Sequence, residues 1–193
     1  KIDILKDRKV HKNISKLKID YLFHFAAQPG VRYSLINPKK YYDTNIKGYQ
    51  NILENINKTK IKRIIYASSS SVYGDQKNFP TNEQASLNAK NPYGLTKIVN
   101  EEISKIYSSI LKISFIGLRF FTVYGEWGRP DMFIIKLLKS IKQNKTFYLN
   151  KSGNHDRDFT YIGDVANICL RLIRVRVKSD NEVFNICNSN SVN

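Results

Sequence analysis

The feature that most constrains the fold is a repeated alternation of short apolar runs with longer amphipathic segments. Three runs, YLFHFAA (21–27), IKRIIYASSSSVYG (61–74) and SFIGLRFF (114–121), have the length and composition of strands buried on both faces. Residues 37–58 and about 92–111 lie between them and carry apolar side chains at helical spacing. A strand–helix–strand–helix–strand order predicts parallel βαβ units in a doubly wound α/β sheet.

The first of these helical segments begins near Pro38, a residue type suited to a helix start. Its expected apolar stripe consists of Tyr42, Ile46, Tyr49, Ile52, Leu53 and Ile56.

The character of the chain changes after residue 121. The segment TVYGEWGRPDM is rich in turn formers, and it precedes an amphipathic pattern that predicts a helix over 133–145. A short strand over 146–150, a helix over 162–173 and a last strand over 182–187 complete the prediction. We therefore place a domain boundary between 1–121 and 122–193. A helix and a strand of the second part could pack back onto the first domain.

The chain is strongly basic, with a formal charge of +16 from 32 basic and 16 acidic side chains. Charge alone would suggest a nucleic-acid or anionic partner. The lysines are nevertheless scattered, without a basic block of five or more. This favours a solvated surface that prefers phosphate-bearing ligands, and we expect no nucleic-acid partner.

Cysteine content and hydropathy limit the cellular location and the kinds of site that we expect. Cys169 and Cys187 are the only cysteines, and their spacing suggests neither a zinc site nor a disulfide. The sequence has no run of 18 apolar residues, and its opening KIDILKDRKVHK does not read as a signal peptide. We expect a cytoplasmic location, no membrane partner and no metal.

Polar residues follow each of the three predicted strands. The tails are AAQPG, SSSSVYG and FFTVYGEWGRP. Each has an ordinary structural explanation, such as a capped turn for the serines. In a parallel sheet, however, ligands bind beyond the carboxyl ends of the strands, so the three tails are expected to converge on one crevice.

Tyr93 and Lys97 stand four residues apart at the start of the helix over 92–111. Such a pair arises easily by chance in a chain rich in both residue types. On a helix, however, residues i and i+4 are neighbours, and a nearby ammonium lowers the pKa of a phenol. The pair could therefore act as a general base near neutral pH.

Five motifs, in this order, give the chain a family resemblance: HFAAQPGVRYS, YASSSSVYG, NPYGLTK, LRFFTVYGEWGRPDM and RDFTYIGDV. It resembles the extended short-chain dehydrogenases/reductases of the NAD-dependent epimerase/dehydratase family, most closely the UDP-glucuronate 4-epimerases. The resemblance implies a Rossmann-type dinucleotide-binding domain over 1–121, a substrate-binding region over 122–193, and NAD as cofactor. The family's glycine-rich G-x-x-G-x-x-G loop and the acidic residue after its second strand are missing, so we expect a fragment truncated at both ends.

The resemblance also implies roles for individual residues. Tyr93 matches the general acid/base, Lys97 the lysine that lowers its pKa and holds the nicotinamide ribose, and Ser69 the residue that hydrogen-bonds the sugar C4 hydroxyl. The matched cofactor-binding positions, besides Tyr93 and Lys97, are Asp3, Ile4, Ala26, Ala27, Gln28, Asn45 and Ser68. For Asn45, a helix-surface amide is an equal alternative.

Further positions bear on the substrate. Related dehydratases carry two carboxylates directly after the catalytic serine or threonine, and decarboxylases carry one at the second position, where this chain has Ser70 and Ser71. Epimerisation is thus favoured. With these two serines, Thr122 and Arg129 resemble the residues that cradle the C6 carboxylate of a uronate. Arg129 could instead be a solvated loop arginine.

Three other basic or titratable residues are candidates for a binding or core role. Arg32 is a weaker candidate for the same carboxylate. Arg157 matches the arginine that grips the UDP diphosphate, unless it forms a salt bridge with Asp156 or Asp158. His24 lies mid-strand and is predicted to be a core histidine.

The expected function is epimerisation at C4 of UDP-glucuronate, in polysaccharide biosynthesis, through transient hydride transfer to NAD. The expected partner is a UDP-sugar, and a homodimer is left open. Alternatives are another NAD-dependent sugar-nucleotide epimerase, dehydratase or decarboxylase, and an inactive binding fragment. We expect the 193-residue chain alone to be inactive, since the glycine-rich turn normally positions the pyrophosphate.

Overall fold

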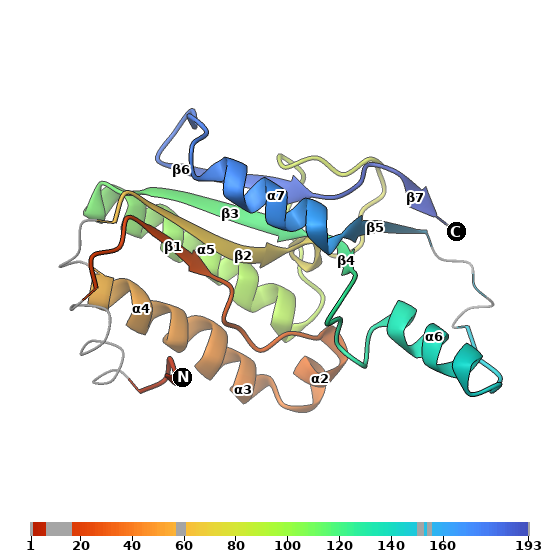
Figure 1. The fold of residues 1–193 in the computed structure, drawn as a ribbon. Coiled ribbons are helices and arrows are strands. Elements are labelled where there is room, and N and C mark those ends of the chain that lie inside the picture. Colours follow the sequence, from red (N-terminus) through yellow and green to blue (C-terminus); the bar gives the residue numbers. More distant parts are fainter. Residues whose placement is uncertain (1, 7–16, 57–60, 150–152, 154–155, 193) are drawn as a thin grey trace. The chain divides into compact units, whose positions relative to one another are not determined.

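The computed structural model describes residues 2–6, 17–56, 61–149, 153 and 156–192 (Figure 1). The chain divides into two compact units. Unit 1 comprises residues 1–120 and 173–185, and unit 2 comprises residues 121–172 and 186–193. The two units are described separately.

A four-stranded sheet forms the centre of unit 1. Its strands are β1 (Tyr21–His24), β2 (Arg63–Ser69), β3 (Ser114–Phe120) and β6 (Asn181–Ile186), in the order β1-β2-β3-β6. β1 pairs parallel with β2, and β2 pairs parallel with β3, with Arg63 opposite Ser114. The predicted parallel α/β sheet is therefore confirmed.

The helices of unit 1 begin with α2 (Val31–Ile36) and α3 (Pro38–Tyr41). The helical path then continues through the π-helical turn η1 (Tyr42–Lys47) into α4 (Gly48–Ile56). The long helix α5 (Pro92–Leu111) matches the predicted segment and packs against β2, β3 and η1 (Figure 1). Tyr49, Leu53 and Ile56 of α4 join strand residues in the main hydrophobic cluster.

The π-helical turn corrects the predicted apolar stripe. Tyr42 is 39% exposed, while Tyr41 and Asn45 are buried, followed four residues later by Tyr49. A π turn holds more residues than an α turn, so the buried face before it is displaced along the sequence. A helical period of 3.6 residues therefore predicts Tyr42 as a core residue, whereas the buried tyrosine is Tyr41.

β1 also departs from prediction, because it is buried on one face only. Leu22 and His24 face α4, whereas Tyr21, Phe23 and Phe25 are between 36% and 44% exposed. Within the described part of the chain, β2 is the only strand that pairs with β1, which makes β1 an edge of the sheet.

Unit 2 holds a small sheet of β4 (Thr122–Tyr124), β5 (Arg157–Tyr161) and β7 (Ser191–Val192). β4 and β5 are parallel, and β7 is antiparallel to β5. None of the three was predicted. The helices α6 (Phe133–Lys142) and α7 (Ile162–Leu172) agree with prediction, but the strand expected over 146–150 is wrong, since 146–149 form no strand and residue 150 lies outside the described residues.

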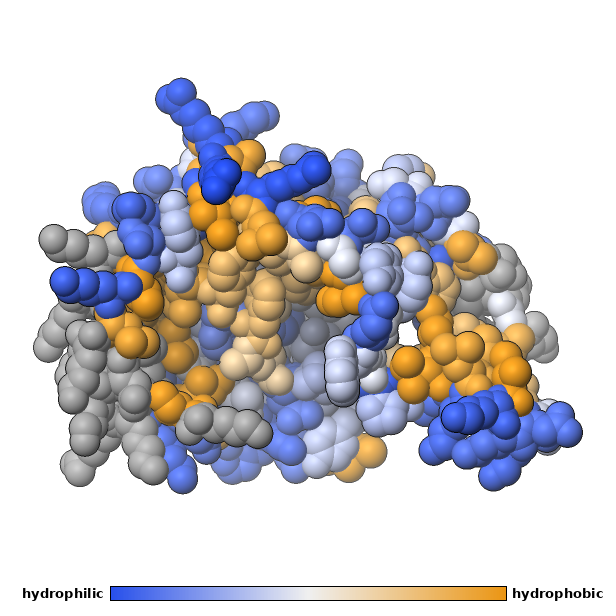
Figure 2. Space-filling view, in the orientation of Figure 1, coloured by the Kyte–Doolittle hydropathy of each residue, from blue (hydrophilic) through white to orange (hydrophobic). Residues whose placement is uncertain are grey.

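α6 has no buried residue. Its apolar side chains Phe133, Leu138 and Ile141 are 43% to 66% exposed, and Figure 2 shows hydrophobic atoms gathered on this helix beside its charged ones. Over the described residues, no helix is both long and apolar enough to cross a bilayer.

Candidate active site

The amino end of α5 presents Tyr93. Asn91 caps the helix by accepting a hydrogen bond of 2.8 Å from the Gly94 amide, and Pro92 occupies the first turn, where its missing N–H costs nothing. The Tyr93 ring meets the ring of Tyr41 edge-on, with centroids 6.2 Å apart. Tyr41 is itself held by its hydroxyl, which donates to the carbonyl oxygens of Pro29 and Gly30. The tyrosine is thus placed by a capped helix and a fixed aromatic neighbour.

Lys97 lies one turn further along α5 and is only 2% exposed. Its Nζ donates a hydrogen bond of 2.8 Å to the carbonyl oxygen of Ala67 and lies 5.9 Å from the centroid of the Tyr93 ring. Burial lowers the pKa of Lys97 to about 8. The structure therefore brings the two residues of the predicted pair onto one face of the helix.

Ser69 ends β2 and caps the 3₁₀ turn η2 (Ser70–Val72). Its Oγ accepts a hydrogen bond of 3.2 Å from the Ser71 amide. α5 approaches this turn closely, because a Cβ added at Gly94 would lie 2.5 Å from the Ser71 carbonyl oxygen. Gly94 therefore permits the contact between the serine turn and the helix that carries Tyr93.

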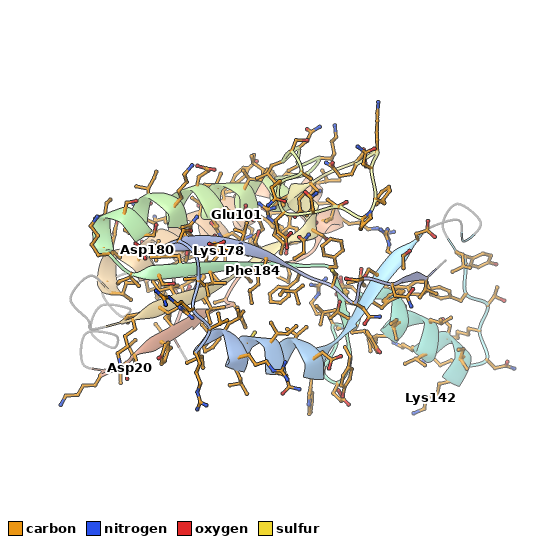
Figure 3. All side chains as sticks on the ribbon, turned by 90° about the horizontal axis from the view of Figure 1, so that it is seen from above. Asp20, Glu101, Lys142, Lys178, Asp180 and Phe184 are labelled. Carbon is orange, nitrogen blue, oxygen red and sulfur yellow. The ribbon has the colours of Figure 1, made fainter. Side chains whose placement is uncertain are left out.

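Ser68 is buried, and its hydroxyl donates to Glu101 Oε1 at 2.5 Å. Glu101 comes from α5 and is labelled in Figure 3. It also accepts two hydrogen bonds from Arg119 of β3, at 2.9 and 2.7 Å. The Ser68 side chain is thus directed to a buried ion pair.

Asn45 links the polar tail of β1 to α5. Its Oδ1 accepts from the Gln28 amide at 2.7 Å, and its Nδ2 donates to the Gln28 carbonyl oxygen at 3.1 Å and to Thr96 Oγ1 at 3.0 Å. Asn45 is 1% exposed, so the helix-surface alternative is wrong. It holds the backbone of Gln28, next to Ala26 and Ala27, which are exposed and half-buried.

The remaining predicted cofactor residues lie near the amino end. Asp3 is exposed, and its carboxylate accepts from the Leu5 amide at 3.0 Å. The Ile4 side chain lies against Gly48 of α4, where a Cβ would come within 2.6 Å of it, and the Ile4 carbonyl oxygen accepts from Asn51. Ile4 is therefore fixed on the helix.

The predicted substrate residues are distributed over both units. Thr122 begins β4 and is half-buried. Arg129 of unit 2 is 41% exposed and forms a bidentate pair with Asp131, at 2.9 and 2.8 Å. This pairing also holds the pKa of Asp131 below its ordinary value.

Arg32 of unit 1 is an exposed residue of α2. Arg157 begins β5 and is exposed. The neighbouring Asp158 accepts from the amides of Asn188 and Asn190, at 2.7 and 3.1 Å, so its carboxylate serves the turn before β7.

His24 behaves as the core residue that was predicted. It is 7% exposed and stacks on Tyr49 with ring centroids 4.8 Å apart. Burial, with a smaller contribution from the charge of Lys97, lowers its pKa to about 4, so the imidazole is neutral at physiological pH. Both cysteines are free, and among the described residues no His, Cys, Asp and Glu side chains cluster in a way that could hold a metal.

Sequence reasoning missed Glu101, Arg119 and Tyr73. Arg119 also donates to the Tyr73 hydroxyl at 2.8 Å and to the Glu83 carbonyl oxygen at 2.9 Å. The available signal was an arginine inside a predicted buried strand, together with a glutamate four residues after Lys97 on the same helix face. A buried charge requires a partner, which points from one to the other.

Comparison with known proteins adds to this geometry. Residues 1–187 match the NAD dependent epimerase/dehydratase family. UDP-glucuronate 4-epimerase 4 of Arabidopsis thaliana is 42% identical over 182 residues, which cover 89% of this chain and 40% of that protein. The chain spans about half the length of the curated relatives it matches.

Solved structures with similar folds include two 4-epimerases. The UDP-glucuronic acid 4-epimerase of Bacillus cereus, in complex with UDP-glucuronic acid and NAD, superposes with a TM-score of 0.89 at 33% identity and covers 99% of this chain and 60% of its own. The UDP-glucose 4-epimerase of Thermotoga maritima with UDP-glucose gives a TM-score of 0.92 at 28% identity, covering 99% and 62%.

Proposed function

We propose, because the chain belongs to the NAD-dependent epimerase/dehydratase family, that the protein inverts C4 of UDP-glucuronate to give UDP-galacturonate, with NAD as its bound cofactor. The observation that carries the proposal is the arrangement of Tyr93 and Lys97 on one face of α5, with Lys97 bonded to β2 two residues before Ser69. This arrangement supplies a proton acceptor, a nearby cation and a hydroxyl for the substrate.

The chain's own groups handle the proton. Tyr93 accepts the proton of the C4 hydroxyl, and the cationic Lys97 favours the phenolate form that does so. Ser69 hydrogen-bonds the C4 oxygen and orients it. When the proton returns from Tyr93 after the C4 configuration has changed, the reaction has inverted one centre without net oxidation.

The N–H donors of the Lys97 ammonium fit the hydroxyl groups of a nicotinamide ribose. An ammonium has three N–H donors, and one of them is used by the Ala67 carbonyl oxygen. Asn45 fixes the Gln28 backbone, and with it the stretch from Ala26 that we assign to the cofactor. Bound NAD would supply hydride acceptance and return at C4, which is the cofactor's chemistry.

Epimerisation is favoured over elimination by the groups that follow Ser69. Ser70 and Ser71 carry no carboxylate. The buried carboxylate of Glu101 is hydrogen-bonded to Ser68, the residue before Ser69, but it is also held by two hydrogen bonds from Arg119. The serine turn thus offers no free acid or base for abstracting a second proton from the sugar.

The uronate assignment rests on similarity and charge. Over 99% of this chain in each case, the identity to the Bacillus cereus uronate epimerase is 33%, against 28% to the Thermotoga maritima UDP-glucose enzyme. We assign Arg129, Thr122, Ser70 and Ser71 to the C6 carboxylate, with Arg32 as a weaker candidate, and Arg157 to the diphosphate. A UDP-glucose epimerase is the second candidate, because its fold matches with the higher TM-score.

The experiment compares the whole protein that contains this chain with its Tyr93→Phe variant. Tyr93→Phe removes the proton acceptor and little volume, so turnover of UDP-glucuronate should fall at least about 100-fold, the scale of general-base catalysis. Binding of UDP-glucuronate, measured by calorimetry, should stay within about threefold, equivalent to less than 1 kcal/mol.

Tyr148→Phe is the matched control, because Tyr148 is 86% exposed. It should leave turnover unchanged. Turnover by Tyr93→Phe within tenfold of the parent would contradict the assignment, and turnover of UDP-glucose in preference to UDP-glucuronate would select the second candidate.

A further inference from the structure

The ion pair of Glu101 and Arg119 has no part in the proposed proton transfer, yet it lies beside the residues that do. Glu101 is one helical turn from Lys97 on α5. The Glu101 side chain is 6% exposed, that of Arg119 is 4% exposed, and two hydrogen bonds join them. Figure 3 shows where Glu101 projects from its helix.

Lys97 and Glu101 hold two consecutive residues of β2. Lys97 Nζ donates to the Ala67 carbonyl oxygen, and Glu101 Oε1 accepts from the Ser68 hydroxyl. Both contacts come from one face of α5, since the two side chains are four residues apart. The next residue of β2 is Ser69, so the strand is fastened to the helix immediately before the proposed substrate-binding hydroxyl.

Arg119 extends the same fastening beyond Ser69. Its Nη1 donates to the Tyr73 hydroxyl, and the guanidinium carbon lies 4.9 Å from the centroid of the Tyr73 ring. Tyr73 directly follows the η2 turn and donates in turn to Asn185 Oδ1 at 2.6 Å. The serine segment is therefore held on both sides by one buried pair.

We propose that Glu101 and Arg119 are a positioning pair, which fixes the distance between Ser69 on β2 and Tyr93 on α5. The kinetic consequence rests on the proposed function. A pair that served stability alone would be replaceable, because apolar residues of similar volume often substitute for a buried ion pair without loss. A positioning pair is not replaceable in this way, since a displacement of about 1 Å can cost about 100-fold in rate.

Two double variants of the whole protein separate these roles. Glu101→Leu with Arg119→Met removes both charges and the acceptor for Ser68. Glu101→Gln with Arg119→Met also removes both charges but keeps an oxygen that can accept from Ser68. The variants share the loss of the Arg119 contacts and differ at the bond to Ser68.

We expect the Leu–Met variant to lose about 10- to 100-fold in kcat, with KM for UDP-glucuronate within about threefold, while it remains folded by circular dichroism. The kcat of the Gln–Met variant should be about tenfold higher than that of the Leu–Met variant. Equal kcat values for the two folded variants, near that of the parent, would overturn the proposal. If neither variant folds, Glu101→Gln and Glu101→Leu are compared alone, with the same expectation and the same overturning result.

Hydrogen exchange of the ligand-free protein gives a readout that does not need the reaction. Amides of residues 68–73 should exchange about tenfold faster in the Leu–Met variant than in the Gln–Met variant, while those of α4 stay unchanged. A parent that turns over no UDP-sugar would refute the proposed function and leave exchange to decide the positioning role. Exchange at 68–73 that is equal in both variants would overturn the positioning role.

Discussion

The ammonium of Lys97 lies where its charge is disfavoured. Burial lowers its pKa to about 8, so it is still mostly cationic at neutral pH. The nearby His24 has a pKa of about 4 and adds no competing positive charge there. Lys97 can therefore act on Tyr93 as the local cation near pH 7, and this effect should decline as the pH rises above about 8.

The same burial predicts a pH dependence of stability. The folded-state pKa of Lys97 is about 8 and the ordinary value is 10.5, so between these pH values the unfolded chain binds more protons than the folded one. The free energy of unfolding should thus rise with pH across this window, by up to about 3 kcal/mol from this group.

The comparison that tests this is urea unfolding of the parent and of Lys97→Met between pH 7 and pH 10.5. The parent should gain stability relative to the variant as the pH increases, because the variant lacks the titrating group. A difference between the two proteins that stays constant over this range would show that the lysine is not buried in solution.

At the residue scale, sequence predicted the groups whose spacing is local. Tyr93 and Lys97 could be paired because four residues separate them on one helix. Glu101 and Arg119 could not, since their partnership depends on how β3 lies against α5. The amide of Asn45 was ambiguous for a similar reason: its partners Gln28 and Thr96 are 17 and 51 residues away.

At the scale of elements, the helical path from Pro38 to Ile56 shows what patterns can and cannot reveal. Its start was predicted from Pro38, and Asn37 does cap it by accepting from the Lys40 amide. The π-helical turn was not predicted, because no residue type marks it. The turn carries Asn45, whose side chain forms hydrogen bonds with Gln28 and Thr96, two residues distant from it in the sequence.

Asn45→Ala should therefore destabilise the protein by about 1–3 kcal/mol, because the Gln28 amide and carbonyl lose their partner. Gln50→Ala is the matched control, since Gln50 is an exposed amide on α4 that bonds Glu54. The control should change the free energy of unfolding by less than about 0.5 kcal/mol. Equal small effects of both variants in urea unfolding would show that the hydrogen bonds of Asn45 to Gln28 do not stabilise the fold.

For the whole molecule, the sheet of unit 1 and the helices α6 and α7 of unit 2 were predictable, whereas the strands of unit 2 were not. The long buried strands β2 and β3 carry strong hydrophobic signals, whereas β4, β5 and β7 are two to five residues long and mostly unburied. Short strands like these are specified by their neighbours more than by their own sequence.

The net charge of +16 also belongs to the molecule as a whole. We expect weak, non-specific binding of a mixed-sequence oligonucleotide that falls at least about tenfold between 50 and 200 mM salt, because counterion release drives it. UDP-glucuronate carries few charges, so its affinity should change less than about threefold over the same range. Calorimetry with both ligands tests this. Tight oligonucleotide binding that persists at 200 mM salt would instead favour a nucleic-acid function.

The one-sided burial of β1 has a consequence for handling the polypeptide. Among the residues that the structure describes, β2 alone pairs with β1, and the exposed rings of Tyr21, Phe23 and Phe25 accompany the edge that faces away from β2. Such an edge is a template on which another strand can add, and proteins ordinarily protect it with charge or cover. The 193-residue polypeptide should consequently aggregate at high concentration through this strand, and a lysine introduced at position 23 would act as a gatekeeper that keeps it dispersed.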